Sequence, residues 1–317
     1  MTSGKICSLH AILGVLLFSV ALFVTLSMNA RDTQADAVST QLEVTNNAPT
    51  VSDVFINNSA YTFADSFVGG TIVLVAGGQK TVHVTGNVRD TNGRGDISSV
   101  ELKFFKTIIG SGCILDSNDC YEVQVCSTRN DTEGDLEVLE YNCQVDLDYW
   151  TDSTSLGGTS PASHWTTRVV VTDNASATGS DTSTTKEIGT LLALDIPTAI
   201  DYGTLSKGER TTSANNQHML LGQRGNDVAD VEVSGADMTC TNTGTIPYAN
   251  QEWSLSDADH SASGSYDLSG TAVDTNIAIG YKTSMDVSKN LYWNIELPAQ
   301  DISGVCTGTM TVIAKAA

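Results

Sequence analysis

Residues 81–88 read TVHVTGNV, and residues 99–105 read SVELKFF. In both stretches apolar residues recur at every second position, so an extended chain would carry them on one face. The run between them, residues 90–96 (DTNGRGD), is rich in the Asp, Asn and Gly residues that favour turns. Two alternating segments joined by such a turn predict a half-buried β-sheet.

The same alternation recurs along the chain and predicts further strands. In the first half they lie at residues 71–75, 121–126, 141–147 and 165–172. In the second half they lie at residues 199–205, 229–233, 277–281, 291–297 and 305–313. Beyond the N-terminal region no stretch keeps a 3.6-residue apolar period. We therefore predict an all-β protein with two consecutive β-sandwich domains of the immunoglobulin-like type, at residues 51–190 and 191–317.

The N-terminal 37 residues have the organisation of an export signal. Lys5 is followed by 18 uncharged residues, Ala11–Met28, and then by Ala35-Asp36-Ala37, a small-x-small cleavage motif. An uncleaved membrane anchor is the alternative, because 18 apolar residues are nearly enough to cross a bilayer. Both interpretations predict export to the cell surface or the extracellular space, with residues 38–50 as a polar linker.

Six cysteines follow this region, and an even number behind an export signal favours disulfides. No Cys-x-x-Cys pair is present, which argues against zinc binding and thioredoxin-like chemistry. Sequence does not fix the connectivity. The clustering of the first four favours two bridges in the first domain and one in the second, namely Cys113–Cys120, Cys126–Cys143 and Cys240–Cys306.

The formal net charge of −21 limits the partners that the chain can have. A surface this acidic repels nucleic acid and anionic membranes and attracts divalent cations. We therefore expect no nucleic-acid partner, and membrane contact only through the N-terminal segment if it stays uncleaved.

A candidate calcium site lies in the turn that follows residues 81–88. Asp90, Asn92 and Asp96 offer oxygen ligands there, and Asp173 follows a later predicted strand and could approach them. The spacing imitates an EF-hand loop, but Arg94 replaces a ligand and strands replace the flanking helices. The alternative is a plain turn in which Asp90 and Asn92 cap their own backbone. Calcium is the one candidate cofactor.

The first predicted domain resembles the immunoglobulin-like or cadherin-like modules of prokaryotic surface proteins. The resemblance covers residues 47–188 and rests on Asn47-Ala48-Pro49, on residues 88–93 (VRDTNG), on residues 96–100 (DISSV) and on residues 170–175 (VVTDNA). The second domain resembles β-rich domains of secreted proteins through residues 200–205 (IDYGTL). Such modules serve as spacers, adhesins and envelope components, so the resemblance implies a location rather than a task.

Signatures of catalysis are missing from the sequence. There is no Gly-x-Ser-x-Gly elbow, no Walker A loop and no His-Glu-x-x-His motif, so we predict no catalytic residues and a protein that is not an enzyme. Two classes of function remain open. One is a structural or adhesive surface protein that assembles with itself or with other envelope subunits. The other is a binding module for a glycan or protein ligand.

Overall fold

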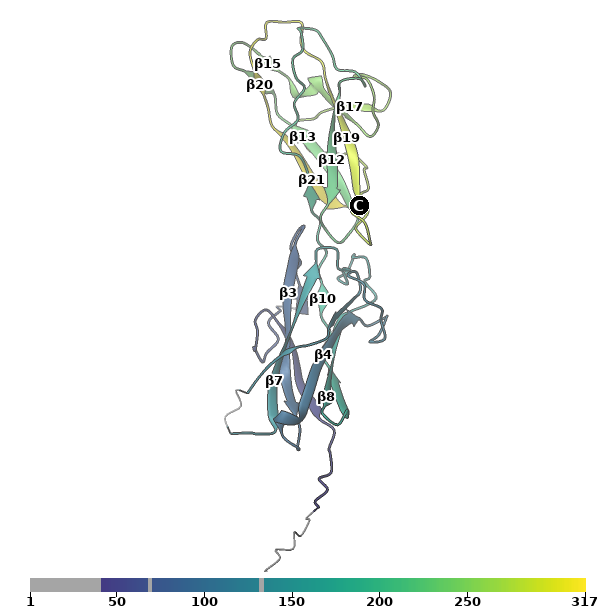
Figure 1. The fold of residues 1–317 in the computed structure, drawn as a ribbon. Coiled ribbons are helices and arrows are strands. Elements are labelled where there is room, and N and C mark those ends of the chain that lie inside the picture. The colour runs from purple at the N-terminus through teal and green to yellow at the C-terminus, as the bar shows by residue number, and fades with distance from the viewer. Residues whose placement is uncertain (1–40, 68–69, 131–133) are drawn as a thin grey trace, which may run out of the picture. The chain divides into compact units, whose positions relative to one another are not determined.

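The computed structural model describes residues 41–317 except 68–69 and 131–133, and the regular secondary structure of these residues consists almost entirely of β-strands (Figure 1). The predicted signal or anchor, residues 1–37, lies outside the described residues. Asn46–Ala317 form one compact unit. Helical segments in the described part of the chain are short 3-10 turns, such as η2 (Arg94–Asp96) and η3 (Tyr248–Asn250). None of its helices has the length and hydrophobicity needed to cross a membrane.

The first sandwich contains two antiparallel sheets of four strands. One has the order β1 (Thr50–Asn57), β3 (Gln79–Arg89), β7 (Val138–Asp148), β6 (Ser127–Arg129). The other has the order β5 (Cys120–Val123), β4 (Ile97–Lys106), β8 (Trp165–Asp173), β9 (Thr178–Thr182). A short parallel pair joins β2 (Thr71–Ile72) to β10 (Glu187–Ile188). This is the strand order of an immunoglobulin-like fold.

The second sandwich has one sheet of five strands and two sheets of three. The first has the order β11 (Leu194–Asp195), β12 (Gln217–Gln223), β19 (Ser288–Ile295), β16 (Gln251–Ser254), β17 (Ser265–Asp267). The second has the order β18 (Val273–Asp274), β13 (Ala229–Gly235), β21 (Met310–Ala316). The third has the order β15 (Thr245–Ile246), β14 (Met238–Cys240), β20 (Cys306–Thr307). The prediction of an all-β chain with two β-sandwiches is therefore confirmed, whereas the predicted domain boundary near residue 190 stays a prediction.

Each sandwich has its own hydrophobic core. In the first, Val82 and Val84 of β3 are fully buried, as the alternation of residues 81–88 predicts, and Phe104 stacks on Trp165 with ring centroids 5.0 Å apart. In the second, Trp293 of β19 lies in a separate cluster between the sheets. Burial of these side chains supplies the main favourable term for folding.

Several predicted strands differ from the structure. Residues 71–75 form a strand only at Thr71–Ile72, because the pairing with β10 covers two residues. Residues 277–281 form no strand, and Ile279 makes a single bridge to Ala229. Residues 199–205 also form no strand, since no neighbouring strand pairs with them in the described part of the chain.

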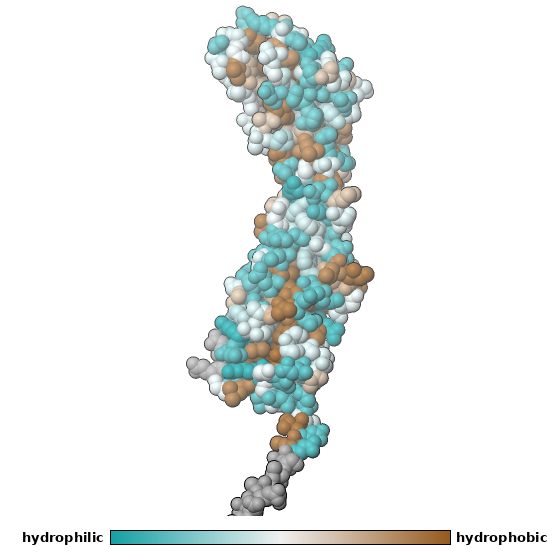
Figure 2. All heavy atoms as spheres, viewed as in Figure 1, coloured by the Kyte–Doolittle hydropathy of each residue, from teal (hydrophilic) through white to brown (hydrophobic). Residues whose placement is uncertain are grey.

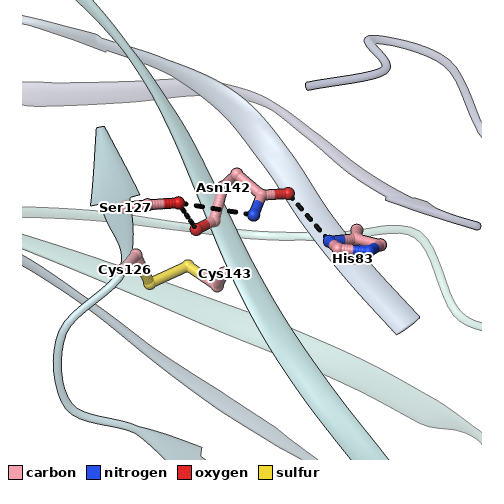
Figure 3. Close-up of a disulfide and its surroundings, with 5 residues drawn as sticks. All are labelled: His83, Cys126, Ser127, Asn142 and Cys143. Atoms are coloured by element: carbon pink, nitrogen blue, oxygen red, sulfur yellow. Dashed lines mark hydrogen bonds between the residues drawn. A yellow bond between two sulfur atoms is a disulfide. The ribbon is translucent and has the colours of Figure 1, made fainter. Parts of the chain in front are cut away.

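The structure joins the six cysteines in the pairing that the sequence favoured: Cys113–Cys120, Cys126–Cys143 and Cys240–Cys306. Figure 3 shows the second bridge, which connects the residue before β6 to β7. Next to it, Asn142 lies within hydrogen-bonding distance of His83 Nδ1 at 3.0 Å, so this half-buried histidine has a polar partner (Figure 3). Three disulfides indicate a protein of an oxidising compartment, extracellular or periplasmic.

Candidate metal centre

Two turns at one end of the first sandwich bring the predicted calcium ligands together. Asp90 follows the last residue of β3, Asp96 ends η2, and Asp173 is the last residue of β8. One carboxylate oxygen from each lies within 4.8 Å of the others. We call Asp90, Asp96 and Asp173 the carboxylate cluster.

Two hydrogen bonds from Asn174 to backbone oxygens hold these two turns against each other. The N–H of Asn174 donates to the backbone oxygen of Asp96 at 2.8 Å, and Asn174 Nδ2 donates to the oxygen of Gly95 at 3.3 Å. Gly93 has a φ of 112°, a backbone conformation that glycine adopts readily, and it turns the chain into η2. The geometry of the two turns therefore sets where the three aspartates of the cluster lie.

Asp90 is buried, and its two carboxylate oxygens have different surroundings. Oδ1 accepts the backbone N–H of Asn92 at 2.7 Å, which is the capped turn that the sequence offered as the alternative to calcium. Oδ2 is buried and accepts no hydrogen bond from the described residues. A buried oxygen that lacks a donor is costly, so this atom calls for a cation or another donor.

Asp173 is also buried, but hydrogen bonds surround it. Asn46 Nδ2 donates to its Oδ2 at 2.8 Å, and the N–H of Ala177 donates to its Oδ1 at 2.8 Å. The hydrogen bond from Asn46, followed by those from the backbone, lowers the pKa of this carboxyl below its ordinary value. Asp173 is therefore held as an anion.

Asn92, the fourth predicted ligand, is exposed, and its Oδ1 accepts the backbone N–H of Asn47 at 2.8 Å. Asn46 and Asn47 thus attach the segment before β1 to both turns. Sequence reasoning missed these two residues as part of the site. Their proximity to the turns depends on the pairing of β1 with β3, in which Thr50 lies opposite Arg89.

The described residues supply the cluster with no ion-paired positive charge. Among the described residues no lysine, arginine or histidine forms a salt bridge with any of the three carboxylates. Arg94, which stands between Asp90 and Asp96 in the sequence, instead directs Nη1 to the backbone oxygen of Asp135 at 3.4 Å. Three carboxylates close together repel one another, and a divalent cation would remove that repulsion.

The donor set fits calcium better than zinc. All the oxygens come from carboxylates and an amide, with no cysteine or histidine in the cluster, and calcium takes six to eight oxygen ligands in flexible geometry. Asp90, Asp96 and Asp173 would supply three of them, with Asn92, backbone carbonyls or water completing the shell. What this arrangement can do chemically is bind a divalent cation, which would neutralise the negative charge of the carboxylate cluster.

Comparisons with known proteins add a structural likeness but no sequence relative. No family model matches the chain, and no curated protein sequence matches it. A search of solved structures matches the CsuC–CsuE chaperone–tip adhesion subunit pre-assembly complex from archaic chaperone-usher Csu pili of Acinetobacter baumannii, at 12% identity and a TM-score of 0.34. The match covers 77% of this chain and 96% of that one. At this identity and TM-score the likeness assigns neither a family nor a function.

Proposed function

We propose that this chain is a non-enzymatic protein of the cell surface with a structural or adhesive role, and that calcium holds the beginning of its first sandwich. One observation carries the proposal. The buried Oδ2 of Asp90, without a hydrogen-bond donor among the described residues, lies in a cluster with Asp96 and Asp173. A cation would provide the missing partner.

Calcium binding fits a place outside the cytoplasm. Extracellular calcium modules bind with dissociation constants of about 10⁻⁴ to 10⁻³ M, so they fill where calcium is millimolar. The three disulfides point to the same oxidising surroundings. The chain is acidic, and each of its two sandwiches contains at least one internal disulfide. Both properties suit a stable, solvated protein outside the cell.

Calcium would act here as a structural ion. Asn46 and Asn47 attach the segment before β1 to Asp173 and Asn92. A cation on the cluster would fix both turns and, through these two contacts, the direction in which that segment leaves the sandwich. For a surface subunit, this would define the orientation of the first sandwich relative to the segment before β1.

Electron microscopy tests the surface role. Immunogold labelling of intact cells that express the full chain should place gold particles on their outer surface. Images of the purified protein with and without EDTA would show whether it assembles and whether assembly needs a divalent cation. Gold found only in sectioned cytoplasm would overturn the proposal. A known cytoplasmic protein of the same cells serves as the labelling control.

A ligand-binding module is the second candidate, favoured by a loop between β4 and β5. The disulfide Cys113–Cys120 closes this loop, and Ile108, Ile114 and Leu115 are exposed on it by 72%, 88% and 56%. Grouped exposed apolar side chains mark protein contact sites. A pull-down on immobilised host or envelope proteins tests it, with I108D/I114D as the variant that should lose capture and L156D, at another exposed leucine, as the control.

A further inference from the structure

The two sandwiches differ at one sheet edge. In the first, β8 pairs with β4 on one side and with β9 on the other. In the second, the corresponding sheet has the order β18-β13-β21, and β21 pairs only with β13 among the described residues. In the part of the chain that the structure describes, no strand thus pairs with the outer edge of β21 as β9 pairs with β8. The outer edge of β21 offers backbone N–H and C=O groups to an added strand.

A groove lies along this edge. Its volume is about 660 Å³, and its walls include Ile196, Ile200, Tyr202, Met219, Met310 and Val312. Ile200, Tyr202, Met310 and Val312 are partly buried against the core of the second sandwich, so the groove is where that core reaches solvent. We call it the edge groove.

The sequence on the far side of the groove is suited to a strand but forms none. Residues 199–205 alternate, which predicts a strand, yet no strand pairs with them in the described part of the chain, and Ala199, Ile200 and Tyr202 line the edge groove. A strand inserted between this segment and β21 would cover the apolar walls.

The chain also carries a segment that matches such an insertion. Residues 38–45 read VSTQLEVT, which places Val38, Thr40, Leu42 and Val44 on one face of an extended strand. In the structure Leu42 and Val44 are 86% and 72% exposed, and Gln41–Asn46 form no strand. Figure 2 shows brown hydrophobic atoms on this stretch, beside the grey ones. Its eight residues match the seven of β21 in length.

The segment is too short to reach the edge groove of its own chain. Asn46 is fixed at the Arg89 end of β3 by its bond to Asp173, whereas Gly77, before the other end of β3, donates to Arg224 of the second sandwich at 3.1 Å. The 11 residues of β3 span about 36 Å at about 3.3 Å each. Eight extended residues span at most about 28 Å.

We infer that residues 38–45 of one copy add as a strand to β21 in the edge groove of a second copy, with Leu42 and Val44 in the apolar groove. Strand addition of this kind combines main-chain hydrogen bonds with pockets for alternate side chains. Because each copy has one such segment and one such groove, the contact is head-to-tail and joins copies into a closed ring or an open filament. The inference rests on the proposed surface role and names its partner: another copy of this chain.

Sedimentation of the full chain over rising concentration tests the inference with two matched variants. L42D/V44D places two charges on the inserted face and should remain monomeric, with association at least tenfold weaker than wild type. S39D/Q41D places the same charge on the opposite face and should assemble like wild type. All four positions precede Asn46 and its contacts with the first sandwich, so neither variant should disturb that fold.

Any other pattern overturns strand addition. A wild type that stays monomeric does so, as does an L42D/V44D variant that assembles normally, or an S39D/Q41D variant that loses assembly equally. A second measurement is the binding of a fluorescent peptide of residues 38–46 to L42D/V44D protein, which should saturate, while the same peptide carrying both aspartates should not. Failure of these tests would leave surface labelling and calcium binding untouched, so it is separable from failure of the proposed function.

Discussion

Asn46 donates a hydrogen bond from Nδ2 to Oδ2 of Asp173 at 2.8 Å, across 127 residues of sequence. This contact connects the segment before the first sandwich to the last residue of β8. It also occupies one oxygen of a carboxylate that lies with Asp90 and Asp96. The beginning of the sandwich and the candidate calcium site are therefore one structural feature.

The carboxylate cluster should destabilise the protein when no cation is present. Replacing Asp90 by Asn keeps an oxygen for the N–H of Asn92 and gives the cluster a donor in place of a charge. In EDTA at neutral pH we expect D90N to be about 1 kcal/mol more stable than wild type, because like charges are removed and a hydrogen bond to an anion is gained. Urea unfolding measures this.

The control for that substitution is E101Q, which removes a carboxylate on β4 outside the cluster. Its free energy of unfolding in EDTA should equal that of wild type within about 0.5 kcal/mol. A D90N protein less stable than wild type in EDTA would mean that the three carboxylates do not repel one another.

The ion pair between Lys186 and Asp65 should make stability depend on acid. Partial burial alone would raise the pKa of Asp65, but the hydrogen bonds from Lys186 and from the N–H of Ile56 lower it below the ordinary value. A carboxyl with a folded-state pKa below its unfolded one stabilises the protein above the unfolded pKa of about 3.9, and this is lost as the pH falls through the folded value.

We therefore expect D65N to be about 0.5–1 kcal/mol less stable than wild type at pH 7, since Asp65 remains partly exposed. The difference should shrink as the pH falls from 7 to about 2, because Asp65 becomes protonated first in the unfolded state and then, through its lowered pKa, in the folded state. Urea midpoints at the two pH values measure it. If D65N is less stable than wild type by the same amount at both pH values, the loss of stability comes from packing rather than from charge.

The three disulfides should contribute unequally. Cys240–Cys306 closes a span of 66 residues and Cys113–Cys120 one of 7. Chain entropy then predicts a loss of about 4 kcal/mol for the double alanine variant of the long bridge and about 2 kcal/mol for that of the short one. Denaturant unfolding of the two variants compares them, and an equal loss would show that loop length does not determine the contribution.

Periodicity predicted most of the first sandwich because its strands bury alternate residues. It failed at residues 199–205, where the pattern is present but the described residues offer no partner strand, since a strand forms only with a neighbour. It also missed β12, in which Met219, Leu221 and Gln223 are buried and the glutamine hides the alternation.

The candidate calcium site was predictable only where its residues are close in the sequence or follow a recognisable strand. Asp90, Asn92 and Asp96 stand together in the sequence, and Asp173 follows a recognisable strand. The roles of Asn46 and Asn47 depend on the register of β1 against β3, which no local pattern encodes. The unequal surroundings of the two Asp90 oxygens likewise arise only from the folded turn.

Calorimetric titration of the full chain with calcium tests the central claim most directly. We expect one site per chain with a dissociation constant of about 10⁻⁴ to 10⁻³ M. The site should be absent in D90N and retained in E101Q. Heats for wild type that equal those of buffer up to 10 mM calcium, or a D90N protein that binds like wild type, would contradict a calcium site at Asp90, Asp96 and Asp173.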